Sequence, residues 1–416
     1  MRVWIVNHYA ALPTDGAGTR HFDLGRVLAR RGHTVVVFAS SYGHFGRSDA
    51  LAGSKRLAGT QRVARVVFRW IRTPRYTGSG LPRIVNMLVF AGMFPVVQLL
   101  HRRPDVIVGS TVHPFAAMSA LMVARARRVP FVYEVRDLWP ETLVDMGAVR
   151  LGSISAQLFS LIQRRLCGGA DHVIYLLPGA AEVLRPMVRP GTPLSWLPNG
   201  VDLSAPEVPV PEAIALATAK ARADDTVLIG YVGSMGPANG LDTLVEAMHL
   251  VEERAPRTVR CLLVGDGPDR ETLESTAVGS CPTAVVFLPR IDKGAVRPFL
   301  RSIDAAVVVV RDLPVYRFGI SLNKLFDYLG AARPVVIASA AVNDPIAEAS
   351  AGMSVPPGDP SALADAILGM ARTTPAERAK MGRRGFEYVR EHHEIQVLAA
   401  QFEAILLSVI QGRSRP

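Results

Sequence analysis

The residue types best suited to chemistry lie between Arg317 and Val336, where a polar loop runs into a short predicted helix. Ser321, Asn323 and Lys324 stand at the predicted start of this helix, where backbone N–H groups lack intrahelical partners and attract anions. Asp327 follows one turn later, where its carboxylate could accept hydrogen bonds from a ribose. A nucleotide fits this set of groups, although a capped surface helix with an ordinary lysine would show the same residues.

Glycine-rich loops mark two further places where a ligand could approach the backbone. Gly16 and Gly18 follow the apolar run Val3–Val6, and the loop Gly233–Gly240 follows the run Thr226–Tyr231. Glycine lacks a Cβ, so a substrate can come close to the chain there. Neither loop has the G-x-G-x-x-G spacing with a following acid that is typical of dinucleotide-dependent dehydrogenases.

Side chains with their own chemistry follow other predicted strands. His113 comes after the run Val106–Val108 and could bond a ligand or be a structural histidine. Asp137 comes after Phe131–Val135 and could orient a ligand or cap the helix that follows. Arg20, at the start of the first predicted helix, could reach a ligand phosphate or remain solvated.

The order of apolar runs and helical segments predicts the elements that position these residues. Strand, loop and helix alternate in two series, which indicates two α/β domains, and polar residues follow the strands at the edge where ligands bind. We expect an N-terminal domain over residues 1–200, a linker over 201–225, a C-terminal domain over 226–390, and a final helix over 391–416 that could cross back to the N-terminal domain. Two such halves predict a ligand cleft between them.

Composition narrows the class of protein. The chain has 416 residues, long enough for two cores, and its cysteines, Cys167, Cys261 and Cys281, lack the paired spacing of a zinc site. This cysteine usage indicates a reducing compartment, and no signal peptide is evident. We therefore expect a cytoplasmic protein.

The net charge of +11 is concentrated in the N-terminal part of the chain. Residues 1–110 hold sixteen Lys or Arg and four Asp or Glu, a balance of +12, so the remaining residues sum to −1. The excess is densest from Lys55 to Arg75, a run without acids. Such a run could attract an anionic membrane surface, a diphosphate-bearing acceptor or nucleic acid. It contains no recognised nucleic-acid module, so we expect no nucleic acid partner.

The apolar segment 84–100 favours the membrane among these partners. Asn86, Pro95 and Gln98 interrupt the segment, and it is short for a helix that spans a bilayer. A helix lying in the interface fits, and so does a buried core helix. We expect peripheral contact with an anionic membrane surface at the inner face of the cell membrane.

Six motifs follow one another along the chain. They are the glycine loop after the first strand, Arg136-Asp-Leu-Trp-Pro-Glu141, Pro198-Asn-Gly-Val-Asp202, Gly230-Tyr-Val-Gly233, Leu263-Val-Gly-Asp-Gly-Pro268 and Asn323-Lys-Leu-Phe-Asp-Tyr328. In this order they resemble the retaining family 4 glycosyltransferases with the GT-B fold, and the resemblance covers almost the whole chain. It is strongest to bacterial exopolysaccharide and O-antigen enzymes, among them N-acetylfucosaminyltransferases. The resemblance implies two Rossmann-like α/β domains that face each other across a cleft.

The resemblance also implies that the two domains bind different substrates. The C-terminal domain would bind a nucleotide-sugar donor through loop and helix-start residues: Gly233, Ser234, Gly265, Arg290, Gly319, Ile320, Ser321, Asn323, Lys324 and Asp327. The N-terminal domain would bind the acceptor or the transferred sugar through Gly16, Gly18, Arg20 and His113. The candidate catalytic residues are His113, Lys324 and Asp137.

The sequence departs from the family pattern at three places. Asp327 stands where Glu is commoner, and Gly319 stands where relatives carry a second Glu near the sugar, so backbone N–H groups around Gly319 are expected to contact the donor instead. The second glycine loop lacks the Arg and Lys that neutralise the diphosphate in many relatives. Lys324 is the expected substitute, ahead of Arg290 and Lys293.

Cleavage of a sugar–phosphate bond places negative charge on the departing diphosphate, so stabilising this charge is the main catalytic task. Lys324, helix-start N–H groups and the second glycine loop could do so without a metal, and the chain has no D-x-D pair. We expect a metal-independent enzyme with a UDP-sugar as co-substrate and no other cofactor. The resemblance implies same-face transfer of the sugar, for which we expect an N-acetylated deoxyhexose. The basic N-terminal part and the segment 84–100 favour a lipid-linked saccharide as the acceptor, with other glycans as the alternative.

Two alternatives share this plan of two domains. A nucleotide-sugar epimerase of the GT-B type would turn over the UDP-sugar without an acceptor and would use more acids than the sequence offers. An inactive nucleotide-sugar-binding protein would account for the missing carboxylate at Gly319.

Overall fold

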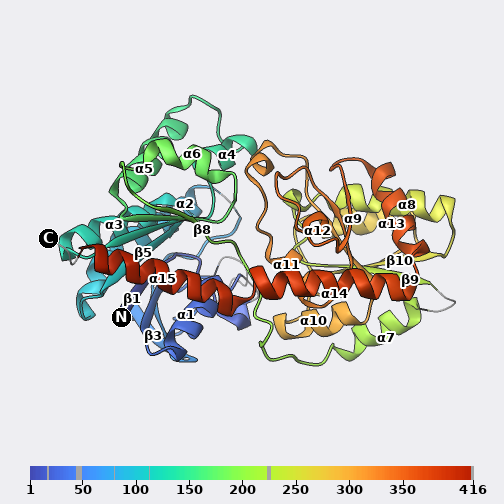
Figure 1. Cartoon of the computed structure of the whole chain (residues 1–416), viewed down its shortest axis with the longest axis horizontal. Helices are drawn as coiled ribbons and strands as arrows, with labels where there is room; N and C mark the ends of the chain where they lie inside the picture. Colours follow the sequence, from blue (N-terminus) through green and yellow to red (C-terminus); the bar gives the residue numbers. More distant parts are fainter. Residues whose placement is uncertain (16–17, 44–48, 79, 112, 223–225, 414–416) are drawn as a thin grey trace. The chain divides into compact units, whose positions relative to one another are not determined.

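The chain forms two compact units in the computed structural model (Figure 1). Unit 1 comprises Met1–Asn199 and Ile395–Pro416, and unit 2 comprises Gly200–Glu394. The structure describes residues 1–15, 18–43, 49–78, 80–111, 113–222 and 226–413.

Unit 1 is built on a sheet whose described strands run in the order β3-β4-β2-β1-β5-β6-β7-β8. Neighbouring strands are parallel except in the β3–β4 hairpin. The strands are β1 (Arg2–Val6), β2 (Thr34–Ser40), β3 (Ala58–Val63), β4 (Val66–Ile71), β5 (Val106–Thr111), β6 (Phe131–Val135), β7 (His172–Tyr175) and β8 (Leu194–Trp196). The direction of strand order reverses between β1 and β5, so the loops that follow these two strands diverge and leave a crevice.

Helices cover both faces of the unit 1 sheet because neighbouring residues of each strand point to opposite faces. Ile5 packs with α1 and with Phe402 of α15, whereas Trp4 packs against Phe38, which contacts Phe94 of α2. The helices are α1 (Arg20–Arg30), α2 (Leu81–Val97), α3 (Pro114–Arg127), α4 (Glu141–Asp145), α5 (Ile154–Gly169), α6 (Ala180–Leu184) and α15 (Ile395–Arg413). Short 3₁₀ turns are η1 (Pro13–Asp15), η2 (Gln98–Leu100) and η3 (Arg185–Met187).

Unit 2 has a sheet of parallel strands in the order β11-β10-β9-β12-β13-β14. Numbered within the unit this order is 3-2-1-4-5-6, the arrangement of a Rossmann fold, with its reversal between β9 and β12. The strands are β9 (Val227–Val232), β10 (Val259–Val264), β11 (Val285–Leu288), β12 (Ala305–Val309), β13 (Val335–Ala338) and β14 (Gly352–Val355). Their near-continuous apolar residues are those of a sheet buried on both faces.

Two separate cores flank the unit 2 sheet. Helices α8 (Leu241–Arg254), α9 (Arg270–Ser280) and α13 (Pro360–Arg372) pack on one face. The opposite core includes α7 (Glu212–Ala221), α10 (Lys293–Arg301), α11 (Asn323–Gly330), α12 (Pro345–Glu348) and α14 (Pro375–His392). The 3₁₀ turns are η4 (Pro237–Asn239) and η5 (Pro314–Phe318).

The ends of the predicted domains differ from the observed units. Of the predicted linker, 201–225, the described residues 201–222 belong to unit 2, where the alanine-rich helix α7 buries Ile214 in the core. Helix α15 belongs to unit 1, where Glu403 accepts hydrogen bonds from Arg31 and His33, at 2.6 and 2.5 Å. The chain thus leaves unit 1 once and returns for its last helix.

Candidate functional site

The candidate donor residues of unit 2 gather at the carboxyl ends of β9, β10 and β12. Gly233 and Ser234 directly follow β9, and Gly265 directly follows β10. The loop after β12 leads through η5 to the start of α11 at Asn323. These segments meet where the strand order reverses, which is where Rossmann folds bind nucleotides.

Lys324 is the central cation of this site. Its Nζ donates to the hydroxyl of Tyr231 at 2.7 Å and to Oδ1 of Asn239, and it lies 4.5 Å from the centre of the Tyr231 ring. Burial lowers the pKa of Lys324 to about 7. A lysine in this state gains a full charge when an anion binds beside it, which suits the binding of a diphosphate.

The loops beside Lys324 require glycine. A Cβ on Gly265, whose φ is +152°, would lie 1.9 Å from the carbonyl oxygen of Gly233. A Cβ on Gly233 would lie 3.0 Å from the Tyr231 hydroxyl and 3.5 Å from Cε of Lys324. The two glycines therefore let the β9 and β10 loops pack closely and leave room for the lysine side chain.

Ser234 shapes the same loop through its backbone. Its carbonyl accepts hydrogen bonds from the Tyr231 hydroxyl at 2.6 Å and from Nδ2 of Asn239 at 2.9 Å. Asn239 therefore bonds both Lys324 and the loop that Ser234 begins. Sequence reasoning missed Tyr231 and Asn239, although both lie in or next to the second glycine loop.

Asp327, the predicted ribose ligand, is paired with a lysine. Its buried carboxylate accepts a hydrogen bond from Nζ of Lys293, which is the first residue of α10. Lys293 therefore holds the acid at a fixed position, and its own ammonium is half-exposed. Arg290, the other cation considered, is exposed on the loop before α10.

Two of the backbone N–H groups that we expected to contact the donor, those of Gly319 and Ile320, already have partners within unit 2. The N–H of Gly319 donates to Tyr316 at 2.9 Å, and the N–H of Ile320 donates to Oδ1 of Asn343 at 2.8 Å. Nδ2 of Asn343 returns a hydrogen bond to the Ile320 carbonyl at 3.0 Å. This two-way amide contact fixes the loop, and its partner lies 23 residues away, beyond the reach of motif analysis.

The start of α11 remains suited to an anion. The residue before the helix is Leu322, whose side chain has no hydrogen-bond acceptor, so it cannot cap the first N–H groups. Ser321 and Asn323 are half-buried on either side of it. The positive end of the α11 dipole and Lys324 thus come from the same turn.

In unit 1 the equivalent reversal point holds a pair of histidines. His113 follows β5 and His8 follows β1, and Nε2 of His113 lies 2.5 Å from Nδ1 of His8. Burial, followed by the charge of Arg83, lowers the pKa of His113 to about 3, so the ring is neutral near pH 7. Nδ1 of His113 is buried without a hydrogen-bond partner among the described residues.

Arg20 is buried, which corrects both readings of it as a solvated or acceptor-binding side chain. Its guanidinium bonds Glu134 at 2.9 Å and the carbonyls of Leu197 and Pro198 at 2.9 and 2.5 Å. Burial would raise the pKa of Glu134, but His21 and Arg20 face the carboxylate and hold its pKa well below the usual value. This network joins α1 to β6 and to the end of β8, so we assign it a structural role.

The other predicted site residues of unit 1 are Asp137, Gly18 and Gly16. Asp137 does not cap α4, whose N-cap residue is Pro140, and burial raises the pKa of Asp137 despite the charge of Arg136. Gly18 is exposed before α1, and Gly16 lies outside the described residues. Within the described ranges, no group of three His, Cys, Asp or Glu side chains is arranged to hold a metal ion.

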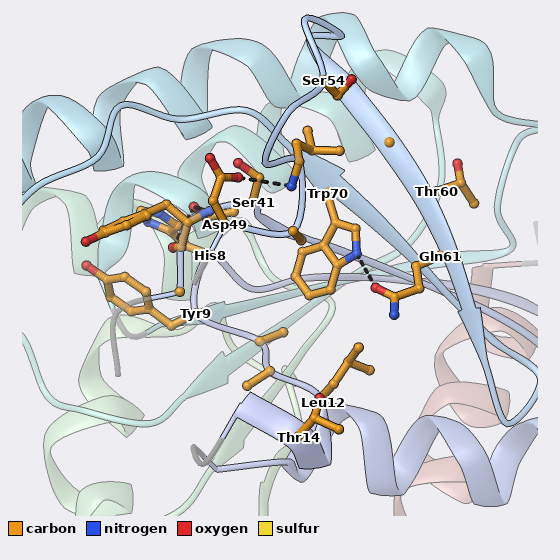
Figure 2. A pocket seen from close by; sticks show the side chains of 18 of the residues that line it. His8, Tyr9, Leu12, Thr14, Ser41, Asp49, Ser54, Thr60, Gln61 and Trp70 are labelled. Atoms are coloured by element: carbon orange, nitrogen blue, oxygen red, sulfur yellow. Dashed lines mark hydrogen bonds between the residues drawn. The ribbon is translucent and has the colours of Figure 1, made fainter. Parts of the chain in front are cut away.

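A cavity of about 650 Å³ opens beside His8, at the carboxyl ends of β1 and β2 and against the β3–β4 hairpin. Figure 2 shows the ring of Trp70 in its wall, with Nε1 bonded to Oε1 of Gln61 at 2.9 Å. Oγ of Ser41 is buried at this cavity without a hydrogen-bond partner in the described structure. We did not predict this cavity, because the segment that forms the β3–β4 hairpin was identified in the sequence only as a run of basic residues.

Both parts of the chain match glycosyltransferase family models. Residues 14–205 match Glycosyltransferase Family 4, and residues 226–373 match Glycosyl transferases group 1. A probable glycosyltransferase, WbjE, of Pseudomonas aeruginosa is 22% identical over 375 residues, which is 88% of each chain.

Solved structures extend this similarity to the fold of the whole chain. Sucrose-phosphate synthase from Thermosynechococcus elongatus matches with a TM-score of 0.74 at 19% identity, over 99% of both chains. HepE of Anabaena, in complex with UDP and glucose, matches with a TM-score of 0.66 at 15% identity, over 98% of this chain and 100% of the other. The two Rossmann-like units therefore define a protein of the GT-B fold. With glycosyltransferase models matching both of its parts, family 4 over residues 14–205 and group 1 over 226–373, the chain is a glycosyltransferase, and transfer is favoured over the epimerase and binding-protein alternatives.

Proposed function

We propose that this glycosyltransferase is retaining and metal-independent, and that it transfers the sugar of a UDP-sugar to a lipid-linked saccharide or related glycan. The observation that carries the proposal is Lys324, whose ammonium lies at the reversal point of the unit 2 sheet between two glycine loops and the start of α11. HepE, whose fold is similar, was solved with UDP and glucose, which supports the choice of nucleotide.

The donor would bind with its diphosphate beside Lys324 and its ribose beside Asp327. A carboxylate accepts hydrogen bonds from two ribose hydroxyls, and Lys293 keeps the Asp327 carboxylate in place. As the sugar–phosphate bond breaks, negative charge grows on the β-phosphate, and Lys324 and the α11 N–H groups stabilise it. These groups need no metal ion for this task, and no further cofactor enters the proposal.

Retention follows if the acceptor hydroxyl attacks from the same face as the departing diphosphate. The leaving phosphate oxygen then accepts the hydroxyl proton, so the protein need not supply a nucleophile. His113 is neutral near pH 7, so its role would be a hydrogen bond to the sugar and not proton transfer as an imidazolium. An N-acetylated deoxyhexose is the sugar we propose, on the strength of the motif order alone.

We propose that the unit 1 cavity holds the acceptor saccharide. Sugars combine apolar C–H faces with many hydroxyls, and the cavity offers both kinds of partner: the rings of Tyr9 and Trp70 together with the polar groups of Ser41, Asp49 and Gln61 (Figure 2). The cavity adjoins the His8–His113 pair, because His8 also lines it.

Calorimetric titration of the full chain with UDP, GDP, ADP and dTDP in the presence of EDTA tests the donor part of the proposal. We expect micromolar binding of UDP that is lost in Lys324→Ala and retained in Lys380→Ala, a matched control that removes an exposed lysine of α14 in the same unit. Binding that needs a divalent ion would refute metal independence. Tighter binding of another nucleotide would replace UDP in the proposal.

A further inference from the structure

The outer faces of α2, α3 and α5 expose an unusual amount of apolar surface. Of the twenty large hydrophobic side chains exposed over the described residues, thirteen lie between Leu81 and Leu161. We call the helical part of this set the docking face: Leu81, Ile84, Val85, Leu88 and Val96 of α2, Met122 of α3, and Ile154, Leu158 and Leu161 of α5. Single exposed hydrophobic residues are ordinary, but a continuous patch marks an interaction surface.

The three helices lie side by side, so their exposed residues form one face. Oγ of Ser119 in α3 donates to the Ala91 carbonyl of α2 at 2.7 Å, and Phe115 of α3 lies 6.0 Å from Phe159 of α5. On α2 the exposed residues Leu81 and Leu88 are seven positions apart, two turns along one side of the helix. Because the opposite sides of the helices pack on the sheet, these side chains point outward.

The charge of this region has a single sign. Segments 81–103, 114–133 and 150–170 contain nine arginines and no Asp or Glu. The arginines are Arg83, Arg102, Arg103, Arg125, Arg127, Arg128, Arg150, Arg164 and Arg165. Helices with exposed apolar side chains on segments whose only charged residues are arginines match an anionic lipid surface. It does not match a second copy of itself, since a twofold contact would place arginines against arginines.

The helices lie along unit 1 and do not leave it. Two described helical segments, Leu81–Leu100 and Ile395–Gly412, have the length and composition of a membrane span, and each is one-third buried. The inner side of α2 holds Phe90 and Phe94 in the core, and Asn86 donates to Thr73 at 2.9 Å. A helix that is half core and half apolar surface fits a position parallel to the bilayer.

We infer that the docking face rests on the anionic cytoplasmic surface of the cell membrane, with its apolar side chains among the acyl chains and arginines at the lipid phosphates. This inference names the surface that would bring the proposed enzyme to a lipid-linked acceptor, and it rests on the proposed function only for that purpose. The acceptor cavity adjoins the face, because Arg83 of α2 donates to the Tyr9 hydroxyl at 3.1 Å and Tyr9 lines the cavity.

The docking face replaces the basic run as the membrane surface. Within Lys55–Arg75, Arg72 donates to the carbonyls of Arg56 and Leu51, at 2.8 and 3.0 Å, and Arg75 pairs with Asp49 at 3.3 Å. Arg72 therefore holds the β3–β4 region together, and fewer cations of the run are available to lipid than the sequence had led us to expect.

Sedimentation with lipid vesicles tests the inference on the full chain. Vesicles of phosphatidylcholine alone are compared with equimolar phosphatidylcholine and phosphatidylglycerol at low salt. The docking variant is Leu88→Glu with Ile154→Glu, and the matched control is Leu216→Glu with Val278→Glu, at exposed apolar helix positions of unit 2. A third variant, Arg62→Glu with Arg65→Glu, reverses exposed charges of the β3–β4 hairpin.

We expect the wild type and the unit 2 control to bind the anionic vesicles, and the docking variant to bind at least about tenfold more weakly. Circular dichroism of each protein reports folding and UDP calorimetry reports donor binding, so a failure of the proposed function does not affect the vesicle readout. Unchanged binding by the docking variant, or loss confined to the hairpin variant, would overturn the inference. A wild type that does not bind anionic vesicles would also overturn the inference. The same holds if sedimentation velocity shows a dimer that dissociates in the Leu88→Glu, Ile154→Glu variant.

Discussion

The lowered pKa of Lys324 predicts that donor binding weakens as the pH rises from 6 to 8. With a pKa of about 7, the lysine is about nine-tenths protonated at pH 6 and about one-tenth protonated at pH 8. A diphosphate beside the ammonium favours the charged form, so the pKa rises in the complex. UDP must then supply the free energy of protonating the lysine at pH 8, which costs about 1.4 kcal/mol and raises Kd about tenfold.

The sign of this effect follows from proton linkage. The complex binds more protons than the free protein between the two pKa values of Lys324, so binding becomes weaker with pH in that range and takes up close to one proton per UDP at pH 8. Below pH 6 the lysine is charged in both states, and its contribution no longer depends on pH.

Calorimetry of UDP binding at pH 6, 7 and 8, in buffers with different ionisation enthalpies, measures both Kd and proton uptake. The control is Lys324→Arg, which stays charged throughout this range. It also corrects for the terminal phosphate of UDP, which ionises near pH 6 and acts in the opposite direction. Equal pH dependence in the wild type and in Lys324→Arg would refute the argument that Lys324 is partly neutral in the free protein and becomes charged when the diphosphate binds.

Three further substitutions test other parts of the site. Gly265→Ala places a Cβ against the Gly233 carbonyl, so we expect UDP binding to fall at least about tenfold, and unchanged calorimetry would contradict the close approach. Asp327→Ala removes the ribose acceptor and is expected to weaken UDP at least about tenfold while pyrophosphate binding stays within about twofold; equal losses would argue against ribose contact. Glu134→Ala leaves Arg20 buried without its carboxylate, so we expect the free energy of unfolding in urea to fall by about 3–5 kcal/mol, and a fall below about 1 kcal/mol would mean that the network is not structural.

Local sequence patterns were sufficient for most of the sheet and for the positions of Lys324 and Asp327 in the first turns of α11. The apolar run Phe131–Val135 predicted β6 at its observed bounds, and Val3–Val6 and Thr226–Tyr231 predicted β1 and β9 to within one residue at each end, because buried parallel strands are continuous apolar segments. The helix start predicted where Lys324 and Asp327 lie. We did not predict the hairpin of β3 and β4. Its edge strand β3 is exposed and polar, so it lacks the alternation of apolar and polar residues that marks a half-buried strand.

Contacts between distant residues could not be predicted in the same way. His113 meets His8 across 105 positions, and Arg20 reaches Pro198 across 178. Such pairs depend on the order of strands in the sheet, which local periodicity does not encode. The polar residues after β1 were the available signal for His8, since they stand at the strand edge where ligands bind.

The return of α15 to unit 1 has a consequence for the synthesis of the protein. A ribosome makes residues 1–199 first, but these lack the helix that covers Ile5 and Leu28, and it arrives only after all of unit 2 has been made. Unit 2 is one continuous piece of chain and can fold as soon as it emerges. Unit 1, which is translated first, is therefore the last to finish folding. Until then the nascent chain carries an uncovered apolar surface that a chaperone acting at the ribosome is suited to protect.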